Sequence, residues 1–475
     1  MITFPLRFRE LDSNRLLFSN EAGRSFIGSR SFLDRYVHDS LCESDKAFLS
    51  ENGLAIDDAD KLGALGYLTT LAARLPVQKQ IDYLILVPTL RCNLSCSYCQ
   101  VSRASENAKG FDWSDDTTHK AISFLKNLPI SSHIKIEFQG GEPLLRTDIL
   151  DKVMREVSKE RPDSSFVICS NLSNLGPEQI KLFQEYNVVL STSLDGPAET
   201  HKHNRTKNEG ATRRFLDNLD RFRDLFDGER ISALPTIDLT DPPSTESLLD
   251  SYDALGITSI YLRPVNHQGF ARKRGLGLDD ALSSWLDYYR KAVDEIIHRN
   301  SQRSKNLLEE YSLTLAIKRI LRPGIDNNVD LRNPAPLGLD YLVIDYDGKI
   351  YPTDEARMLG RIGRIDLSLG RIGGELNYER IRDLNSQSFN NIDPDCQHCV
   401  YQPYCGSDVV DDLSRYGRID IPRHDTYFCR RQTDLFDLAT SLLCSKDLHV
   451  LHSLCAWLNL PELPDQIIPV HNDTA

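Results

Sequence analysis

Residues 82–99 read DYLILVPTLRCNLSCSYC, in which a continuous apolar run leads directly into three closely spaced cysteines. The run at residues 83–87 has the length and composition of a buried strand. Helical segments alternate with five further strand candidates, at residues 134–138, 165–169, 188–193, 231–237 and 259–265. Six strand–helix units in a row predict an α/β fold with a parallel sheet, closed or nearly closed into a partial (β/α)6 TIM-like barrel.

The composition limits the classes of partner. The 475 residues are 40% hydrophobic and 26% charged, which suits a large packed core. The net charge is −13 and no basic run stands out, so no nucleic acid partner is expected. No run of about 18 apolar residues occurs, so no membrane partner is expected either. The first residues lack a signal-peptide pattern, which predicts a cytoplasmic protein whose clustered cysteines are metal ligands or catalysts rather than disulfides.

Five units are expected along the chain. Residues 1–80 suggest a hairpin or meander followed by helices at 31–37 and 59–74, and residues 341–351 suggest a second hairpin. Helical patterns at residues 281–297 and 306–321 lead out of the barrel. The units are a small N-terminal α+β unit (1–80), the barrel (81–305), a helical linker (306–335), a cysteine-rich extension (336–440) and a helical tail (441–475).

The first cysteine group, Cys92, Cys96 and Cys99, has the spacing C-x3-C-x2-C. Three thiolates can hold three irons of a 4Fe–4S cluster and leave the fourth iron open to a small chelating molecule. A zinc site would need a fourth ligand, and the nearest histidine, His119, has no ligand-like spacing. Three buried free cysteines are a further alternative, but a short loop after a strand is a poor place to bury them.

This spacing, with Tyr98 just before the third cysteine, resembles the signature of the radical S-adenosylmethionine (radical SAM) superfamily. Gln139 and the four residues after it, Gly140, Gly141, Glu142 and Pro143, resemble that family's glycine-glycine-glutamate-proline motif, although alone they could be an ordinary turn. The resemblance implies that this strand end binds the methionine amino group of S-adenosylmethionine. It also implies reductive cleavage of that cofactor to a 5′-deoxyadenosyl radical.

Two later strand ends extend the resemblance. Ser170 and Asn171 stand where the family often has threonine-asparagine-glycine, and Ser193 and Asp195 belong to a segment similar to the serine-leucine-aspartate-glycine run of peptide-modifying members. The resemblance implies that Ser193 contacts the cofactor and that Arg205 binds its carboxylate. Ordinary surface polarity is the alternative for each of these residues. His201 and His203 are expected to be solvated loop residues.

A second cysteine group lies near the C-terminus, at Cys396, Cys399, Cys405 and Cys429. Four thiolates suit either zinc or an iron–sulfur cluster. The arrangement resembles the SPASM extension of radical enzymes that modify ribosomal peptides, which usually carries two auxiliary clusters. Cysteines expected for one of them are absent at residues 333–337, Thr353 and Val409. The resemblance therefore implies one auxiliary 4Fe–4S cluster, ligated entirely by protein, with structural zinc as the alternative.

Asp354 follows one of these absent cysteines. In sulfatase-maturing relatives the acidic residue at this place takes a proton from the substrate, so the resemblance makes Asp354 a candidate general base. An exposed loop carboxylate is the alternative. The other cysteines, Cys42, Cys169, Cys444 and Cys455, lack ligand spacing and are expected in the core.

The chain as a whole resembles the larger radical SAM enzyme of the His-Xaa-Ser peptide-modifying system, notably at residues 4–9, 87–92 and 99–103. This implies crosslinking or oxidation of a ribosomally made precursor peptide with His-Xaa-Ser repeats. The implied partners are a second radical SAM enzyme and an electron donor such as flavodoxin or ferredoxin. Residues 1–80 resemble a leader-peptide recognition module, or they cap the barrel without a binding role. A sulfatase-maturase-like oxidation of cysteine or serine and a non-catalytic peptide-binding scaffold are the competing functions.

Overall fold

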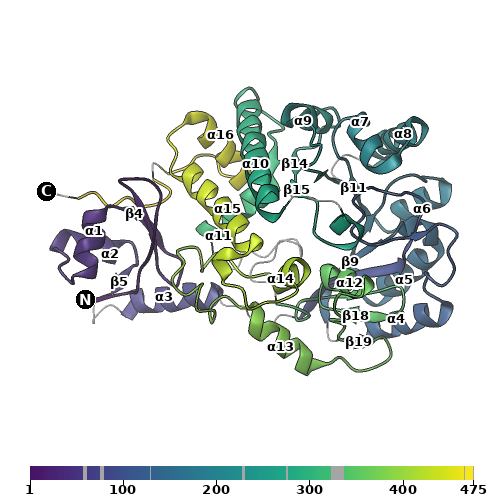
Figure 1. Ribbon diagram of the computed structural model, residues 1–475, viewed down its shortest axis with the longest axis horizontal. Helices are drawn as coiled ribbons and strands as arrows, with labels where there is room; N and C mark the ends of the chain where they lie inside the picture. Colours follow the sequence, from purple (N-terminus) through teal and green to yellow (C-terminus); the bar gives the residue numbers. More distant parts are fainter. Residues whose placement is uncertain are drawn as a thin grey trace.

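The computed structural model describes residues 1–56, 61–74, 80–128, 130–226, 230–273, 277–322, 336–464 and 466–473. A small N-terminal unit lies at one end of the elongated molecule and the barrel sheet at the other (Figure 1). Between them pack four helices from the second half of the chain: α10 (Leu278–Ser301), α11 (Tyr311–Leu321), α15 (Tyr427–Leu443) and α16 (Leu448–Leu458).

The barrel is built on a sheet that has eight strands among the described residues, in the order β12-β11-β10-β9-β6-β17-β18-β19. The first six are parallel, as the sequence predicts for the barrel strands. Residues of β6 are buried almost without a break, which is typical of a parallel strand covered on both faces. The strands are β6 (Ile81–Thr89), β9 (Ile130–Gly140), β10 (Ser165–Cys169), β11 (Val189–Ser193), β12 (Ile231–Leu234), β17 (Tyr341–Ile344), β18 (Lys349–Tyr351) and β19 (Gly370–Arg371).

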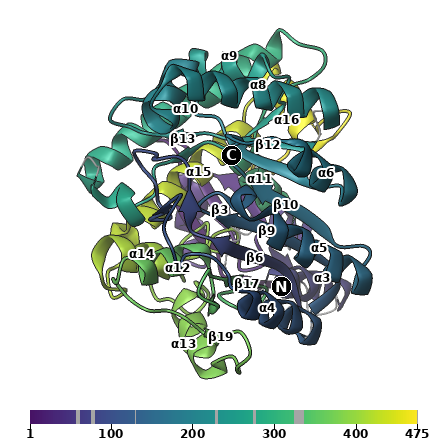
Figure 2. The ribbon, with the colours of Figure 1, turned by 90° about the vertical axis from the view of Figure 1, so that its right-hand side faces the viewer.

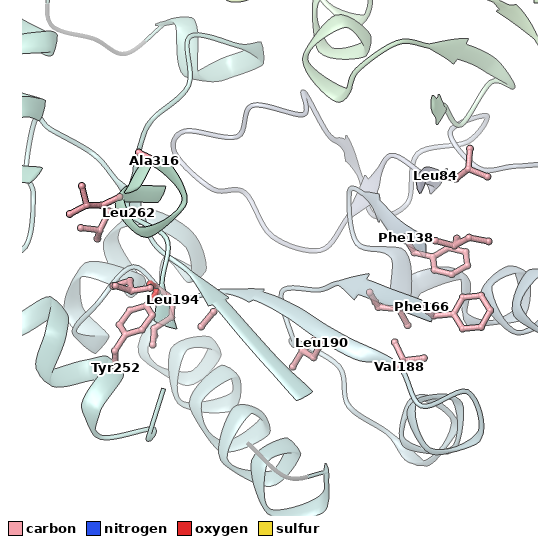
Figure 3. Close-up of a cluster of buried hydrophobic side chains, with 14 of the residues drawn as sticks. Leu84, Phe138, Phe166, Val188, Leu190, Leu194, Tyr252, Leu262 and Ala316 are labelled. Carbon is pink, nitrogen blue, oxygen red and sulfur yellow. The ribbon is translucent and has the colours of Figure 1, made fainter. Parts of the chain in front are cut away.

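Helices cover one face of this sheet (Figure 2). In α5, residues Ile149, Leu150, Val153, Met154 and Val157 are buried, which is the spacing of one helical face. Figure 3 shows where such apolar faces meet the strands, with Phe138, Phe166 and Leu190 pointing into a common core. The covering helices are α4 (Asp115–Asn127), α5 (Thr147–Glu160), α6 (Pro177–Glu185), α8 (Glu209–Phe226) and α9 (Thr245–Asp253).

The last two expected barrel strands are broken in the structure. The expected strand 231–237 divides at Pro235, which has no N–H to donate to a ladder, into β12 and β13 (Thr236–Ile237). The expected strand 259–265 divides into β14 (Ser259–Ile260) and β15 (Arg263–Pro264), because Leu262 N donates to the Glu310 carboxylate at 3.1 Å instead. These pieces pair with β13 and β16 (Glu309–Glu310) outside the main sheet, so the barrel is open on this side.

The hairpin expected at residues 341–351 is present, but it joins the barrel. Its first strand, β17, pairs in parallel with β6. Helix α11 begins at Tyr311 rather than at residue 306, because Glu310 caps it by accepting a hydrogen bond from Leu313 N. Outside the N-terminal unit, the other described helices are η1 (Pro143–Arg146), α7 (Ala198–His201), η2 (Lys202–Thr206), η4 (Gly269–Lys273), α12 (Asp354–Arg361), α13 (Tyr378–Ser388), α14 (Val409–Tyr416) and η6 (Arg423–Asp425).

The N-terminal unit contains an antiparallel meander, and helices follow it in sequence. The meander is β2 (Arg7–Glu10), β3 (Leu16–Ser19) and β4 (Ser25–Gly28), and a short pair joins β1 (Ile2–Thr3) to β5 (Ala55–Ile56). The helices are α1 (Arg30–Val37), α2 (Glu43–Glu51) and α3 (Lys61–Arg74). Helix α2 was not expected from the sequence, and the expected start of the last helix at residues 59–60 lies outside the described residues.

The C-terminal tail is helical only as far as the end of α16. Its last described residues are extended, and Val470 forms a parallel bridge with Ile27 of β4. The expectation of a helical tail is therefore wrong for these residues, whose position depends on a contact more than 400 positions away in the sequence. Among the described helices, none combines the length and the apolar sequence needed to cross a bilayer.

Candidate functional site

A cavity of about 450 Å³ lies at the carboxyl ends of the parallel strands and extends into the barrel. The three cysteines of the first group and Asp354 all line it. Eleven residues expected at the site line this space, namely Cys92, Cys96, Tyr98, Cys99, Gly140, Gly141, Ser170, Asn171, Ser193, Arg205 and Asp354. The sequence signals, spread over more than 250 positions, thus converge on one cavity.

The cysteine loop leaves the end of β6 through two short strands, β7 (Arg91–Cys92) and β8 (Ala104–Ser105). Its base is fixed by a hydrogen bond from Ala104 N to Leu90 O at 2.8 Å and by an ion pair between Arg91 Nε and Asp112 at 2.8 Å. Cys92 is buried, and its Sγ accepts a hydrogen bond from Leu94 N at 3.4 Å. The loop is therefore held before any ligand binds.

The three thiols lie close enough to influence one another. Burial, together with the nearby charges of Glu142, Cys96 and Cys99, raises the pKa of Cys92 to about 12. In the described part of the chain, no three His, Cys, Asp or Glu side chains are as close as a single metal ion requires. Soft thiolates at wider spacing beside an open cavity are the donor set that a multi-iron cluster needs, so these residues fit a 4Fe–4S cluster.

Gly140 and Gly141 are needed for the packing of the chain itself. A Cβ on Gly140, whose φ is +129°, would lie 2.2 Å from Thr89 O, and one on Gly141 would lie 2.2 Å from Arg91 O. Gly141 N and Glu142 N donate to those two carbonyls at 3.0 and 2.8 Å. The glycines thus let the end of β9 lie directly against the start of the cysteine loop, a role that the sequence had suggested only toward the cofactor.

Glu142 turns away from the cavity. Its carboxylate accepts hydrogen bonds from Ser170 Oγ at 2.9 Å, Asn171 N at 2.8 Å and Leu144 N at 3.0 Å, and only 2% of the residue is exposed. Burial raises the pKa of Glu142 to about 7 despite these donors. Pro143 begins η1 beneath it. Both residues therefore shape the wall, joining the ends of β9 and β10, and do not line the cavity.

Asp195 also lies behind the wall, where it organises three donors. Its carboxylate accepts from the Tyr98 hydroxyl, from Arg205 Nε at 3.0 Å and from Thr236 N at 3.2 Å. Burial alone would raise the pKa of Asp195. The charge and hydrogen bond of Arg205 act in the opposite direction, and the pKa of Asp195 is lowered as a result. This network connects the cysteine loop, through Tyr98, to the ends of β11 and β12 and fixes the Arg205 guanidinium at the cavity.

The two histidines of this region differ. His201 is 1% exposed and stacks on Phe215 with ring centroids 4.1 Å apart, and burial lowers its pKa to about 4. The expectation of a solvated His201 is therefore wrong, because α7 packs its last residue against α8. His203 is exposed, as expected.

Asp354 is the first residue of α12, after the N-cap residue Thr353. It is 6% exposed, and its Oδ1 accepts a hydrogen bond from Nε of the fully buried Arg357 at 2.7 Å. Arg357 also lies 3.6 Å from Asp345, whose pKa burial raises to about 6. Asp354 is therefore a positioned carboxylate at the cavity wall, and the alternative of an exposed loop carboxylate is wrong.

The second cysteine group converges outside this cavity. Burial is the main reason that the pKa of Cys405 lies well above its ordinary value, and the charges of Cys396, Cys399 and Cys429 add to it. Cys429 sits in the first turn of α15, where Thr426 caps its N–H at 3.2 Å. Four mutually close thiols are a donor set that fits a cluster held entirely by protein.

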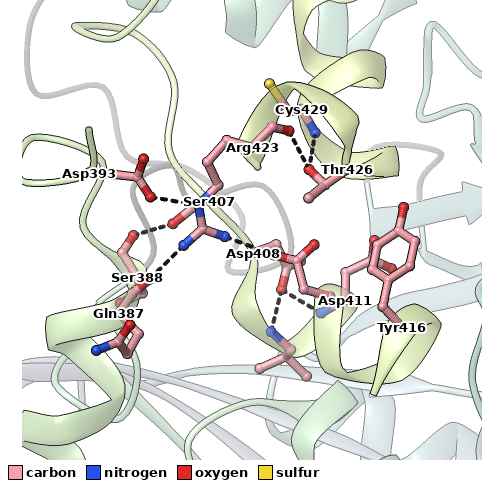
Figure 4. A network of polar contacts seen from close by, with 12 residues as sticks. Gln387, Ser388, Asp393, Ser407, Asp408, Asp411, Tyr416, Arg423, Thr426 and Cys429 are labelled. Atoms are coloured by element: carbon pink, nitrogen blue, oxygen red, sulfur yellow. Dashed lines mark hydrogen bonds and ion pairs between the residues drawn. The ribbon is translucent and has the colours of Figure 1, made fainter. Parts of the chain in front are cut away.

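Arg423 links this group to its surroundings (Figure 4). Its guanidinium donates to Asp393 at 2.7 Å, three residues before Cys396, and to Asp412 of α14 at 2.8 Å. Its carbonyl accepts the Thr426 hydroxyl at 2.9 Å, next to Cys429. Arg423, through its side chain and its carbonyl, thus joins both ends of the cysteine group to α14, which borders the cavity.

The N-terminal unit contacts the loop that carries Cys396, Cys399 and Cys405. Ser19 Oγ donates to Val400 O at 2.6 Å, Tyr404 OH donates to Gly23 O at 2.9 Å, and Arg7 Nε donates to Gln397 O at 2.5 Å. The loop is therefore enclosed between two parts of the chain that are almost 400 residues apart.

Residues at the positions of the absent cysteines line the main cavity. They are Leu337, Thr353 and Val409; residues 333–335 lie outside the described residues. Glu137 and Cys169 were not expected in the cavity, where Cys169 Sγ donates to Glu137 at 3.0 Å. The alternation of β9 would have indicated Glu137, because Lys135, Glu137 and Gln139 face the same side. Cys42 is exposed, so the core assignment is wrong for Cys42 as well as for Cys169.

The sequence of the barrel segment matches a known family. The model of the Radical SAM superfamily matches residues 86–248. An uncharacterized protein of Methanocaldococcus jannaschii is 32% identical over 118 residues, 24% of this chain and 39% of that protein. A cysteine-type anaerobic sulfatase-maturating enzyme of Clostridium perfringens is 27% identical over 133 residues, 26% of this chain and 35% of that enzyme. The chain thus spans under half the length of these curated relatives.

Two solved structures have a similar fold. Native anSMEcpe with bound AdoMet aligns with a TM-score of 0.57 at 16% identity, covering 75% of this chain and 97% of that one. Streptococcus suis SuiB bound to precursor peptide SuiA aligns with a TM-score of 0.51 at 15% identity, covering 88% of this chain and 97% of that one. At these identities the likeness concerns the fold. With the family match it leads to one conclusion: residues 86–248 belong to the radical SAM superfamily.

Proposed function

We propose that this chain is a radical S-adenosylmethionine enzyme that modifies side chains of a ribosomally made precursor peptide. The observation that carries the proposal is the cavity itself, which extends from three grouped thiols to the positioned carboxylate of Asp354. Its volume of about 450 Å³ lies within the range of about 300–1,000 Å³ that is typical of small-molecule and cofactor sites.

Cys92, Cys96 and Cys99 would hold the 4Fe–4S cluster, and the backbone of Gly140 and Gly141 with Ser170, Asn171, Ser193 and Arg205 would surround S-adenosylmethionine. When bound, these groups supply reductive cleavage of a carbon–sulfur bond and abstraction of a hydrogen atom. The contribution of this chain is orientation. Arg205 presents a fixed positive charge to a carboxylate, and Asp195 and Tyr98 prevent it from turning away.

Cys396, Cys399, Cys405 and Cys429 would hold one auxiliary 4Fe–4S cluster, with zinc as the alternative. The quartet supports a role in electron transfer or structure rather than substrate binding, because none of its four side chains lines the cavity. Iron and zinc analysis of anaerobically prepared protein separates the two metals.

A peptide substrate is supported by the fold shared with SuiB, which was solved with its precursor peptide. The resemblance to the His-Xaa-Ser system adds the expected partners: a second radical SAM enzyme, a flavodoxin or ferredoxin as electron donor, and a precursor with His-Xaa-Ser repeats in the cytoplasm. The N-terminal unit would bind the precursor's leader. Asp354 would take a proton from the substrate, because it is a positioned carboxylate in the same cavity as the thiols.

Co-expression with the precursor tests the peptide substrate. The wild-type chain is expected to give a peptide whose mass shows loss of hydrogen, and the Asp354→Asn variant to give unmodified peptide while still cleaving S-adenosylmethionine. Asp383→Asn is the matched control, because it makes the same change at an exposed carboxylate of α13 that does not line the cavity. A precursor left unmodified by the wild type, under conditions in which the cofactor is cleaved, would contradict the peptide assignment.

A second candidate is oxidation of a cysteine or serine in a sulfatase, favoured by the similarity of the barrel segment to a sulfatase-maturating enzyme. The absence of the cysteines of one auxiliary cluster counts against it. A peptide containing the sulfatase motif distinguishes the two: formylglycine formation would favour the second candidate. A non-catalytic scaffold would give neither product.

A further inference from the structure

The last described residues of the chain bind to the N-terminal unit as a peptide would. Val470 bridges Ile27 in parallel at the outer edge of β4. Ile27 N donates to Pro469 O at 2.8 Å, and His471 N donates to Ile27 O at 2.8 Å. The segment therefore pairs with the edge of the sheet through one bridge, Val470 with Ile27, and strand addition at a sheet edge is a common mode of recognition for an extended peptide.

His471 enters a pocket of defined chemistry. Its ring centroid lies 4.8 Å from that of Phe32 and 4.9 Å from that of Phe48, and only 7% of the residue is exposed. Its Nε2 lies 3.0 Å from Oδ1 of Asp45, which is completely buried. A histidine can both pack between two rings and donate a hydrogen bond to a carboxylate, and an aliphatic side chain cannot.

Asp473, two residues after His471, is also bound by side chains of the N-terminal unit. Its carboxylate accepts from Ser29 Oγ at 2.5 Å, from Ser31 Oγ at 3.1 Å and from Arg35 at 2.8 Å. Asn472, between the two, is exposed. Because side chains alternate along an extended strand, the groove reads every second residue of the segment.

The contact is made by residues 469–473, which lie outside the main core. Ile468 is 4% exposed and belongs to the main core, so it anchors the segment just before the groove. Only the residues after Ile468 need to leave the groove for another peptide to enter it. Asp45 also pairs with Arg35 at 2.7 Å, through a contact that does not involve residues 469–473, so the buried carboxylate has a partner besides His471.

We propose that the groove formed by β4, α1 and α2 is a peptide-binding site that reads a histidine followed two residues later by an oxygen-bearing side chain. Residues 469–473 of this chain occupy it in cis. The ligand class is an extended peptide with His-Xaa-Asp or His-Xaa-Ser. The link to a His-Xaa-Ser precursor rests on the proposed function, whereas the groove and its present occupant do not. An incoming peptide must displace the chain's own end.

The cis segment weakens binding of a second peptide, because a short tether gives it an effective concentration in the millimolar range. The probe is a fluorescent peptide with the sequence of residues 469–473, PVHND, added to the full chain without cofactors. Its affinity for a full-length His471→Ala/Asp473→Ala variant is expected to exceed that for the wild type at least about ten-fold. Asn472→Ala is the matched control and is expected to behave as the wild type.

Two changes test what the groove reads. Replacing the peptide's histidine by alanine is expected to weaken binding to the double variant at least about ten-fold, and a peptide ending His-Asn-Ser is expected to retain binding. Ser31→Ala in the same background weakens the aspartate peptide. Equal affinity for the histidine and alanine peptides would overturn the histidine pocket. Failure of the serine peptide would overturn the extension to His-Xaa-Ser.

Folding of the variants is checked by circular dichroism and thermal melting. If the double variant does not fold, excess unlabelled peptide added to the wild-type chain must accelerate hydrogen exchange at the His471 amide, and an unchanged rate overturns the proposal. A folded double variant that binds no peptide also overturns it. These measurements use no S-adenosylmethionine, so their failure leaves the proposed enzymatic function untouched, and failure of cofactor cleavage leaves the groove untouched.

Discussion

Arg205 Nε donates to the Asp195 carboxylate at 3.0 Å, in a place where the Asp195 side chain is only 1% exposed. Breaking such a buried pair from one side leaves the other charge without compensation, at a cost of about 3–5 kcal/mol. Tyr98 depends on the same carboxylate, so the pair also holds the third cysteine's neighbour in place.

We therefore expect Asp195→Asn to lower the free energy of unfolding of the metal-free chain by about 3–5 kcal/mol. Urea unfolding monitored by circular dichroism measures it. Asp420→Asn is the control, because Asp420 pairs with Arg418 at the surface, and exposed pairs contribute about 0–1 kcal/mol. Equal losses for the two variants would show that the Asp195 network is not a buried anchor.

Gly141→Ala is expected to disturb the cysteine loop. The new Cβ would lie 2.2 Å from Arg91 O, so the backbone that carries Cys92 must shift, at a cost of about 1–3 kcal/mol. Iron bound per chain after reconstitution should fall as well. As a control, the Cβ added by Gly66→Ala in helix α3 would have no atom within 4 Å. This variant should raise the free energy of unfolding by up to about 1 kcal/mol. Unchanged iron binding in Gly141→Ala would contradict the close packing of β9 on the loop.

Glu310 predicts a pH dependence of stability. Burial raises its pKa to about 7, although Tyr289, Leu313 N and Leu262 N donate to it. The folded state therefore holds a proton that the unfolded state loses at its ordinary pKa of about 4.3. The contribution of this proton to the free energy of unfolding is complete below about pH 4.3. It is lost as the pH rises through about 7, at up to about 1.4 kcal/mol per pH unit.

The quantity to measure is the difference in the free energy of unfolding between the wild type and Glu310→Gln, since Gln does not titrate. The wild type should lose stability relative to the variant as the pH rises from about 5 to about 7. Chemical unfolding at several pH values measures this, and parallel curves for the two proteins would show that Glu310 does not take up the proton. His201, whose pKa burial lowers to about 4, contributes with the opposite sign in both proteins and cancels.

Arg423→Met should disconnect the second cysteine group. It removes the partner of Asp412, which is 2% exposed, and releases the segment that begins at Asp393. Iron per chain should fall from about eight to about four, because each cubane carries four irons. Arg418→Met, at an exposed ion pair, should keep about eight. Zinc in place of the second set of irons would contradict the auxiliary cluster, and full iron in Arg423→Met would contradict the role of Arg423.

The parts of the fold that the sequence predicts well are those with a local signal. The strands at residues 83–87 and 165–169 and the hairpin at 341–351 carry their own apolar pattern and turn residues, and the structure has strands there. The cysteine spacing is local too, which explains why the sequence alone predicts that Cys92, Cys96 and Cys99 share one metal site.

The parts that could not be predicted depend on distant contacts. Nothing near Glu142 in the sequence indicates that its carboxylate turns toward Ser170 and Asn171 rather than the cavity. The pairing of β17 with β6 and the addition of Val470 to β4 join segments that are hundreds of residues apart. Such contacts are decided by packing of the whole chain, for which a single sequence carries no periodic signal.

We propose above all that Cys92, Cys96 and Cys99 form the site that cleaves S-adenosylmethionine. The most direct test is to reconstitute the chain with iron and sulfide without oxygen, add S-adenosylmethionine and a strong reductant, and measure 5′-deoxyadenosine by chromatography. We predict that the wild type forms it and that the folded Cys92→Ala/Cys96→Ala/Cys99→Ala variant does not, while Cys42→Ala, at an exposed cysteine, behaves as the wild type. Equal amounts of 5′-deoxyadenosine from the wild type and the triple variant, or none from a wild type with a full complement of iron, would contradict the account.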